Sequence, residues 1–267
     1  MEVIVVDNGS TDGTRELLRQ HADRVRVIKN EKNLGACRGK NQGILAASSE
    51  LIAFLDSDAT LLNPSTLHDF IGRFREDDRL AALGGGIYED QEKTRPWVFG
   101  IFFTDDLYID WERTKSSGVE AEALSTCFLM MRKNVAFEVG GFDPVFFYQH
   151  EDLDFFLHVG RLGYRCEVMP DYPVWHRISQ VGRTVDRWFW MHLREEWRHQ
   201  YLLIKHLGIS QAIWFLARLW GDGKTMRDYY VRPIRFLKFV VLFGFLPIVM
   251  LLLSPLIVRR REMDFLD

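Results

Sequence analysis

The chain has 267 residues, with 34 Lys and Arg against 37 Asp and Glu and a formal net charge of -3. This length is enough to bury a full core, and the charge balance lacks the basic excess typical of nucleic-acid binding, so we expect no nucleic-acid partner. Cys37, Cys127 and Cys166 are odd in number and widely spaced. That pattern indicates buried thiols in a reducing compartment, so we expect the catalytic part to be cytoplasmic.

Strands and helices alternate along the first 180 residues. Continuous apolar runs predict strands, and the stretches between them predict loops and helices. The predicted strands are residues 2–6, 25–28, Leu51–Leu55, 80–87, 99–103, 124–131 and 164–168, and the predicted helices are residues 15–20, 38–47, 63–74 and 150–163. This order predicts an α/β fold, a mostly parallel sheet flanked by helices, with ligands bound beyond the carboxyl ends of the strands.

Two of the predicted strands end in acidic residues. Asp7 follows the first strand, and Asp56-Ser57-Asp58 follows the third. Hard divalent cations prefer carboxylate oxygen, and Mg²⁺ usually binds one or two carboxylates together with phosphates. Asp and Ser are also common in turns, so either turn alone is compatible with a purely structural role. Two acidic ends on one rim favour a site for a metal and a phosphorylated ligand.

A second group of polar residues lies near the end of this region. Glu151 and Asp152 open a predicted helix, and His176 follows a later strand and loop. Acidic residues in a first helical turn complement the helix dipole by about 0.3–1 kcal/mol, which is the structural alternative for this pair. A neutral imidazole can complete the ligand set of a divalent cation, which makes His176 a candidate metal ligand.

Several segments, taken together, resemble the inverting family 2 glycosyltransferases of the GT-A (Rossmann-like) fold, especially rhamnosyltransferase-like members. The matching segments, in chain order, are VVDNGSTDGT, NLGACRGKNQGI, AFLDSDATL, GGFDPVFFYQHEDLDF with RLGY, and VWH. Their order and spacing match as well, over about residues 1–180, and the set is more specific than any one motif. The resemblance implies a catalytic domain over residues 1–180 that binds a nucleotide-sugar donor.

The resemblance also implies which residues contact this donor. Asp7, with Asn8 in the same motif, would contact the base, and Asp56 would contact the ribose region. Lys40 stands where the family commonly carries a basic residue, so it would face the diphosphate.

The remaining implied roles are metal binding and catalysis. Asp58 would hold the Mn²⁺ or Mg²⁺ that bridges the diphosphate, and His176 is the second candidate ligand. Asp152, in the Glu151-Asp152 pair, would be the general base. A sugar hydroxyl is a poor nucleophile, so a carboxylate must take its proton as it attacks the anomeric carbon. Attack opposite the leaving group inverts the anomeric configuration.

Members of the resembled family begin with one more strand and helix than the present sequence shows. We therefore expect an N-terminally incomplete catalytic domain in which backbone hydrogen-bonding groups next to the absent central strand are exposed.

Residues 181–267 form a predicted helical appendage. Aromatic residues recur at helical spacing in residues 181–232, where they either pack on the catalytic domain or lie at a lipid boundary. Residues 233–267 hold an apolar run with basic flanks, and Pro247 within it leaves a spanning and a re-entrant segment both open. We expect the appendage to bind the cytoplasmic face of a membrane.

The leading hypothesis is a metal-dependent inverting glycosyltransferase that uses a UDP- or dTDP-sugar. Its acceptor would be a hydroxyl of a lipid-linked or cell-surface glycan. A catalytically impaired, membrane-bound module that binds a nucleotide sugar is the alternative. A nucleotidyltransferase is a weaker one, because no Gly- and Lys/Arg-rich phosphate loop is evident.

Overall fold

The computed structural model describes residues 1–105, 107–115, 119–177, 188–210, 213, 246–260 and 265–266. Two compact units make up the chain. Unit 1 comprises Met1–Phe102, Ile109–Ser179 and Asp264–Asp267, and unit 2 comprises Phe103–Tyr108 and Gln180–Met263.

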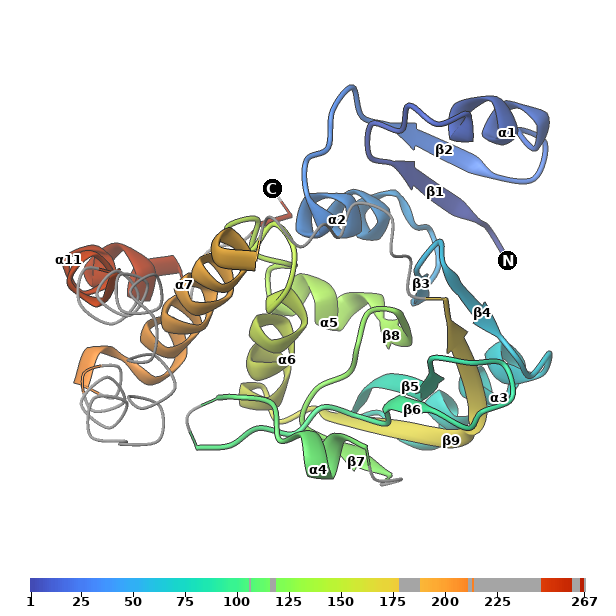
Figure 1. The fold of residues 1–267 in the computed structure, drawn as a ribbon. Helices are drawn as coiled ribbons and strands as arrows, with labels where there is room; N and C mark the ends of the chain where they lie inside the picture. The colour runs from blue at the N-terminus through green and yellow to red at the C-terminus, as the bar shows by residue number, and fades with distance from the viewer. Residues whose placement is uncertain are drawn as a thin grey trace. The chain divides into compact units, whose positions relative to one another are not determined.

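Unit 1 begins with two consecutive βα units (Figure 1). Strand β1 (Ile4–Asp7) is followed by α1 (Thr14–Gln20), and β2 (Arg26–Lys29) is followed by α2 (Ala36–Ala46). The two strands pair in parallel as a separate two-stranded sheet, and α2 packs on β1. The alternation predicted for this region is confirmed, with boundaries that differ by one or two residues.

A seven-stranded mixed sheet forms the rest of unit 1. Its main path runs in the order β3-β8-β5-β9-β4, while β6 pairs with β5 and β7 pairs with β9. These strands are β3 (Leu51–Leu55), β4 (Ala59–Leu61), β5 (Leu80–Tyr88), β6 (Pro96–Val98), β7 (Glu120–Ala121), β8 (Phe128–Arg132) and β9 (Arg165–His176).

The prediction of a mostly parallel sheet is wrong. Among these seven strands, β5 and β9 pair in parallel, and every other pairing between the described strands of the sheet is antiparallel. A parallel connection usually needs a crossover helix, but between β5 and β8 the described residues contain only the four-residue helix α4 (Trp111–Thr114). Strand β8 therefore runs against both of its neighbours, which the spacing of apolar runs does not reveal.

Three further helices belong to unit 1: α3 (Thr66–Glu76), α5 (Lys133–Glu138) and α6 (Glu151–Arg161). Buried aromatic rings join helices to the sheet, with Phe70 of α3 lying 5.7 Å from Phe128 of β8. Phe142 stacks on Phe155 of α6 at 4.4 Å. Helix α3 begins later than predicted because the Asn63 side chain accepts hydrogen bonds from Ser65 in the preceding turn.

Three predicted strands have different extents. Residues 99–103 form an isolated bridge between Ile101 and Ala123 in place of a strand, and β8 begins only at Phe128. Strand β9 continues through the loop predicted at residues 170–173, because a register irregularity opposite Gly85–Ile87 accommodates its two prolines.

Strands β1 and β3 are among the edge strands of the described residues. Strand β1 pairs only with β2, and β3 pairs only with β8. The β3 sequence is entirely apolar, yet Leu55 is 50% exposed. Exposed, apolar strand edges are sites where further strands can pair.

Unit 2 contains two described helices, α7 (Trp188–Leu207) and α11 (Leu246–Arg259), which contact each other. Arg260 donates to the Tyr201 hydroxyl at 2.9 Å. In the described part of the chain, no helix combines the length and the apolar character that a membrane crossing needs. Residues 214–245, which include the first part of the predicted apolar run at 239–258, lie outside the described residues.

Candidate active site

The acidic turn joins β3 to β4 and brings Asp58 beside His176. The Asp56 carbonyl accepts the Ala59 amide at 3.0 Å, which closes the turn. Ala59 of β4 then pairs with His176 at the end of β9. As a result, Asp58 Oδ1 lies 3.3 Å from His176 Nε2. The strand pairing thus brings together the two residues predicted as metal ligands.

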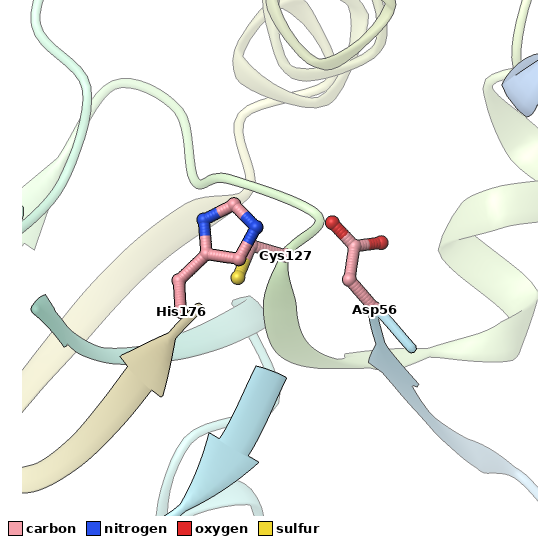
Figure 2. A group of neighbouring side chains, drawn as sticks. All are labelled: Asp56, Cys127 and His176. Atoms are coloured by element: carbon pink, nitrogen blue, oxygen red, sulfur yellow. The ribbon is translucent and has the colours of Figure 1, made fainter. Parts of the chain in front are cut away.

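Asp56, Cys127 and His176 meet at this point from three different strand ends (Figure 2). Each of them offers one ligand atom, and these atoms all lie within 4.8 Å of one another. The Nδ1 atom of His176 is buried and has no hydrogen-bond partner among the described residues. Trp97 packs against the imidazole at a centroid distance of 4.9 Å and limits its rotation.

The available donor atoms suit a hard cation. Burial raises the pKa of the Cys127 thiol, so it stays protonated and is a poor ligand. Oxygen atoms from Asp56 and Asp58 and a nitrogen from His176 remain, a set that fits Mn²⁺ or Mg²⁺. Loss of hydration among protein atoms raises the pKa of Asp56 to about 6, and nearby Asp152 and Asp58 add to the rise. Because Asp56 keeps an exposed surface, solvent screens part of this effect.

Asp152 and Glu151 occupy the first turn of α6. Three residues just before them, Phe147, Gln149 and His150, have positive φ angles of 58°, 69° and 65°. This strained backbone ends the preceding loop and starts the helix at Glu151. The Asp152 side chain is 20% exposed and that of Glu151 is 7% exposed, so Asp152 is the more accessible carboxylate.

Thr126 and Lys40 hold the Asp152 carboxylate. The Thr126 amide donates to Asp152 Oδ2 at 3.1 Å, and its hydroxyl donates to Oδ1 at 2.8 Å. Lys40 Nζ lies 3.3 Å from Asp152 Oδ1 and 2.7 Å from Glu151 Oε1. Burial raises the pKa of Asp152, and repulsion from Glu151 adds to the rise, while Lys40 and the Thr126 hydrogen bonds oppose it.

Lys40 therefore contacts the carboxylate pair in this structure. Besides Glu151 and Asp152, its ammonium donates to the Thr126 hydroxyl. Burial disfavours the charge, but the two carboxylates outweigh it and raise the pKa of Lys40. The diphosphate contact implied for Lys40 stays a prediction.

Asp7 and Asn8 connect loops at the end of β1. Asp7 accepts the Ser10 amide at 2.9 Å and Arg15 Nε at 2.8 Å. These hydrogen bonds, with Ser10 the stronger influence, lower the pKa of Asp7 to about 2. The Asn8 side chain bonds the loop at residues 33–35 and the Asn30 amide group. Their predicted contacts with the donor base stay predictions.

The sequence reasoning missed Thr126 and Trp97 as parts of the site. Thr126 comes just before the apolar strand β8, and Trp97 lies on β6, which none of the predicted strands covers. Neither has a local sequence signal, because each reaches the site through pairing with distant strands.

Comparison with known proteins identifies the family. Residues 1–140, more than half of the chain, match Glycosyl transferase family 2. The chain belongs to this family. Membership places it among the glycosyltransferases, in agreement with the resemblance seen in the sequence.

Two similar bacterial proteins have names that refer to the synthesis of glycan polymers. Poly-beta-1,6-N-acetyl-D-glucosamine synthase of Staphylococcus aureus (strain COL) is 26% identical over 186 residues, covering 67% of this chain and 43% of that protein. The teichuronic acid biosynthesis glycosyltransferase TuaG of Bacillus subtilis (strain 168) is 43% identical over 60 residues, 21% of this chain and 24% of that protein. The chain spans less than half the length of these curated relatives.

Solved structures share the GT-A-like fold. The mannosyltransferase PcManGT from Pyrobaculum calidifontis, in complex with GDP-Man and Mn²⁺, matches with a TM-score of 0.52 at 15% identity, covering 98% of this chain and 79% of that chain. GalNAc-T7 with UDP, GalNAc and Mn²⁺ matches with a TM-score of 0.53 at 14% identity, covering 66% and 37%. At these identities the likeness concerns the fold, an α/β architecture with a mixed sheet flanked by helices.

Proposed function

We propose that this glycosyltransferase moves a hexosyl or deoxyhexosyl group from a UDP- or dTDP-sugar to a glycan hydroxyl, with inversion at the anomeric carbon and with Mn²⁺ or Mg²⁺ bound. The observation that carries the proposal is one accessible carboxylate, Asp152, held by Thr126 and Lys40 in unit 1 together with the Asp58 and His176 pair. Family membership supplies the reaction class.

In this proposal Asp152 is the general base. A base works best when its pKa lies near the working pH, and burial raises the pKa of Asp152 from its ordinary acidic value. The proton of the acceptor hydroxyl passes to an Asp152 oxygen as the hydroxyl oxygen bonds to the anomeric carbon. The bond from that carbon to the donor phosphate breaks, and its electron pair leaves with the nucleoside diphosphate.

Asp58 and His176, with Asp56 beside them, are the residues that would hold the metal ion. A bound divalent cation stabilises negative charge on the departing diphosphate as a Lewis acid. The two neighbours solved with Mn²⁺ share this fold, which supports the choice of metal. Asp7 and Asn8 keep the proposed role at the nucleoside end of the donor.

The proposed acceptor is a lipid-linked or cell-surface glycan, reached from the cytoplasmic face of a membrane. Support comes from relatives named for polysaccharide synthesis and for teichuronic acid biosynthesis. The apolar sequence of α11, with Arg259 at its end, gives the proposed membrane contact an apolar surface next to a basic group.

The test is a transfer assay with UDP- and dTDP-sugars, with Mn²⁺, Mg²⁺ or EDTA. The expected product has the anomeric configuration opposite to the donor, read by NMR of the anomeric proton. Retention of configuration would contradict the proposed single displacement, and release of pyrophosphate would indicate a nucleotidyltransferase. Recovery of all protein in the soluble fraction without detergent would contradict the membrane part.

One observation favours the impaired binding module as a second candidate. The free edges of β1 and β3 among the described residues leave the sheet divided beside the site. In that case a nucleotide sugar would still raise the melting temperature in the presence of Mn²⁺, because it binds only the native state, but no transfer would follow.

A further inference from the structure

We propose that Thr126 and Lys40 are positioning residues that hold the Asp152 carboxylate in the orientation in which it accepts the acceptor proton. This inference rests on the proposed function, because it gives Asp152 the role of general base. It goes further in assigning two side chains to that role, one of which has no recognisable motif.

The Lys40 ammonium uses all of its hydrogen-bond donors within the site. An ammonium group has three N–H donors and no acceptor. Lys40 Nζ contacts three acceptors, the Thr126 hydroxyl, Glu151 Oε1 and Asp152 Oδ1. All three donors are therefore occupied within unit 1. A diphosphate contact by Lys40 would require breaking one of these bonds.

The hydrogen-bond direction of Thr126 follows from this. Because Lys40 only donates, the Thr126 oxygen must accept from it, so the Thr126 proton points to Asp152 Oδ1. The Thr126 amide binds the other oxygen, Oδ2. Two bonds from one residue fix the plane of the carboxylate.

Most of the lone pairs of the Asp152 carboxylate are already occupied. An ionised carboxylate has roughly four acceptor sites. The Thr126 amide, the Thr126 hydroxyl and Lys40 occupy three of them, which leaves about one for an acceptor hydroxyl. The Asp152 side chain remains 20% exposed, so it is not sealed off from solvent.

Thr126 also connects the base to the acidic turn. The next residue, Cys127, accepts the Asp56 amide through its carbonyl at 2.9 Å. Two consecutive residues thus contact Asp152 and the Asp56 strand end. Their backbone sets the spacing between the proposed base and the proposed donor site.

The charged groups near Asp152 determine the direction in which its pKa shifts when Lys40 is replaced. Lys40 comes from α2, Glu151 from the same turn of α6, and Asp56 from the end of β3. Lys40 favours the ionised base, whereas both neighbouring carboxylates oppose it. Loss of Lys40 therefore raises the pKa of Asp152 further, and the acid limb of the pH–kcat profile moves to higher pH.

The experiment compares four site variants and one control variant with the wild-type chain. Lys40→Met is expected to move the acid limb upward by roughly one to three pH units, the usual effect of an adjacent opposite charge. Thr126→Val keeps the amide but loses the hydroxyl, and its kcat is expected to fall roughly ten- to a hundred-fold, as for a hydrogen bond to a charged group. Lys40→Arg and Thr126→Ser should largely restore both values. Lys115→Met, at an exposed lysine, is the matched control.

Several results would overturn the inference. Unchanged acid limbs in an active Lys40→Met and an active Thr126→Val would remove the positioning role. A tenfold loss of donor affinity in Lys40→Met, with the acid limb unmoved, would indicate that Lys40 binds the diphosphate of the donor instead of positioning Asp152. If Lys40→Met does not fold, Thr126→Val alone carries the test.

A second readout separates the inference from the proposed function. NMR titration of ¹³C-labelled aspartate, with Asp152→Asn to assign the signal, follows the Asp152 carboxyl without turnover. If the wild-type chain transfers no sugar, the proposed function fails, and the titration still decides the positioning role. The midpoint is expected to rise in Lys40→Met and Thr126→Val, and an unchanged midpoint in both would refute the contacts as a positioning device.

Discussion

Replacing Asp152 with Asn is the most direct test of the proposed mechanism. The change keeps the size of the side chain and one oxygen that can accept the Thr126 amide. It removes the group that takes the acceptor proton. Because Asp152 lies outside the proposed Asp58 and His176 metal pair, we expect donor binding to survive and transfer to fail.

The expected loss follows from the value of general-base catalysis. A positioned base contributes about 10²–10⁴-fold, which corresponds to about 3–5 kcal/mol of activation free energy. The assay measures kcat at saturating donor and acceptor, and titration calorimetry measures donor Kd with Mn²⁺ present. Asp78→Asn is the matched control, because the Asp78 side chain is fully exposed.

Asp152→Asn also changes the pH dependence of stability. Folding raises the pKa of Asp152, so the native state holds this proton more tightly than the unfolded chain does. The contribution to the free energy of unfolding is fully present below the unfolded pKa of about 3.9 and is lost as pH rises through the raised folded value. Urea unfolding should show a smaller fall in stability across this window in the variant.

Two results would refute this reasoning. A variant that keeps transfer within a few-fold of wild type would move the base role elsewhere, with Glu151 the next residue to test. A loss of donor affinity equal to the loss of rate would mean that Asp152 serves binding.

Three further predictions concern the proposed metal ligands, the loop after β1 and the contact of Gly35 with the loop before Asp152. Asp58→Asn and His176→Ala should each abolish the rise in melting temperature that Mn²⁺ causes, and an undiminished rise would exclude them as ligands. Asp7→Asn should cost at most about 2 kcal/mol in urea unfolding above pH 4, since the folded pKa of about 2 lies below the ordinary value, and this difference should vanish as pH falls through 2. Gly35→Ala should lower both melting temperature and kcat, because the new Cβ would lie 2.6 Å from the Phe147 ring at a φ of +90°; wild-type values would contradict this steric account.

The local order of elements could be predicted from the sequence. Continuous apolar residues marked β3, and the polar turn after it marked the acidic strand end. The helical spacing of Leu67, Phe70, Ile71 and Phe74 predicts the apolar face of α3, on which Phe70 and Phe74 are buried, Leu67 is half-buried and Ile71 is exposed. Such signals lie within a few residues of one another, so the 3.6 and 2.0 periodicities reveal them.

Strand direction and the far partners of a strand could not be predicted. Whether two strands pair in parallel or antiparallel depends on how the chain returns to the sheet after β5. The apolar runs in the sequence do not show this direction. Strand β4 was missed because three residues are too few to show a period. Its pairing with β9 is what brings Asp58 to His176.

The position of Lys40 shows the same limit within the site. Its three partners, Thr126, Glu151 and Asp152, lie 86, 111 and 112 residues away in the chain. A motif shows that a basic residue stands before Asn41, but it gives no information about which charge that residue meets after folding. Only the three-dimensional contacts reveal that all of its donors are used.

Thr126 and Cys127 are adjacent in the chain and together connect Asp152 to the acidic turn at Asp56. If side-chain contacts alone set the distance between base and acidic turn, a single rotamer change would alter it. Here the Thr126 amide donates to the Asp152 side chain, and the Cys127 carbonyl accepts the Asp56 amide, so backbone groups of two adjacent residues contact both sides of the gap. Backbone groups cannot rotate away without disrupting the start of β8, which is buried. The backbone groups that hold the proposed base and the acidic turn are therefore fixed by the start of β8, and the Asp152 side chain is the part of this link that can still rotate.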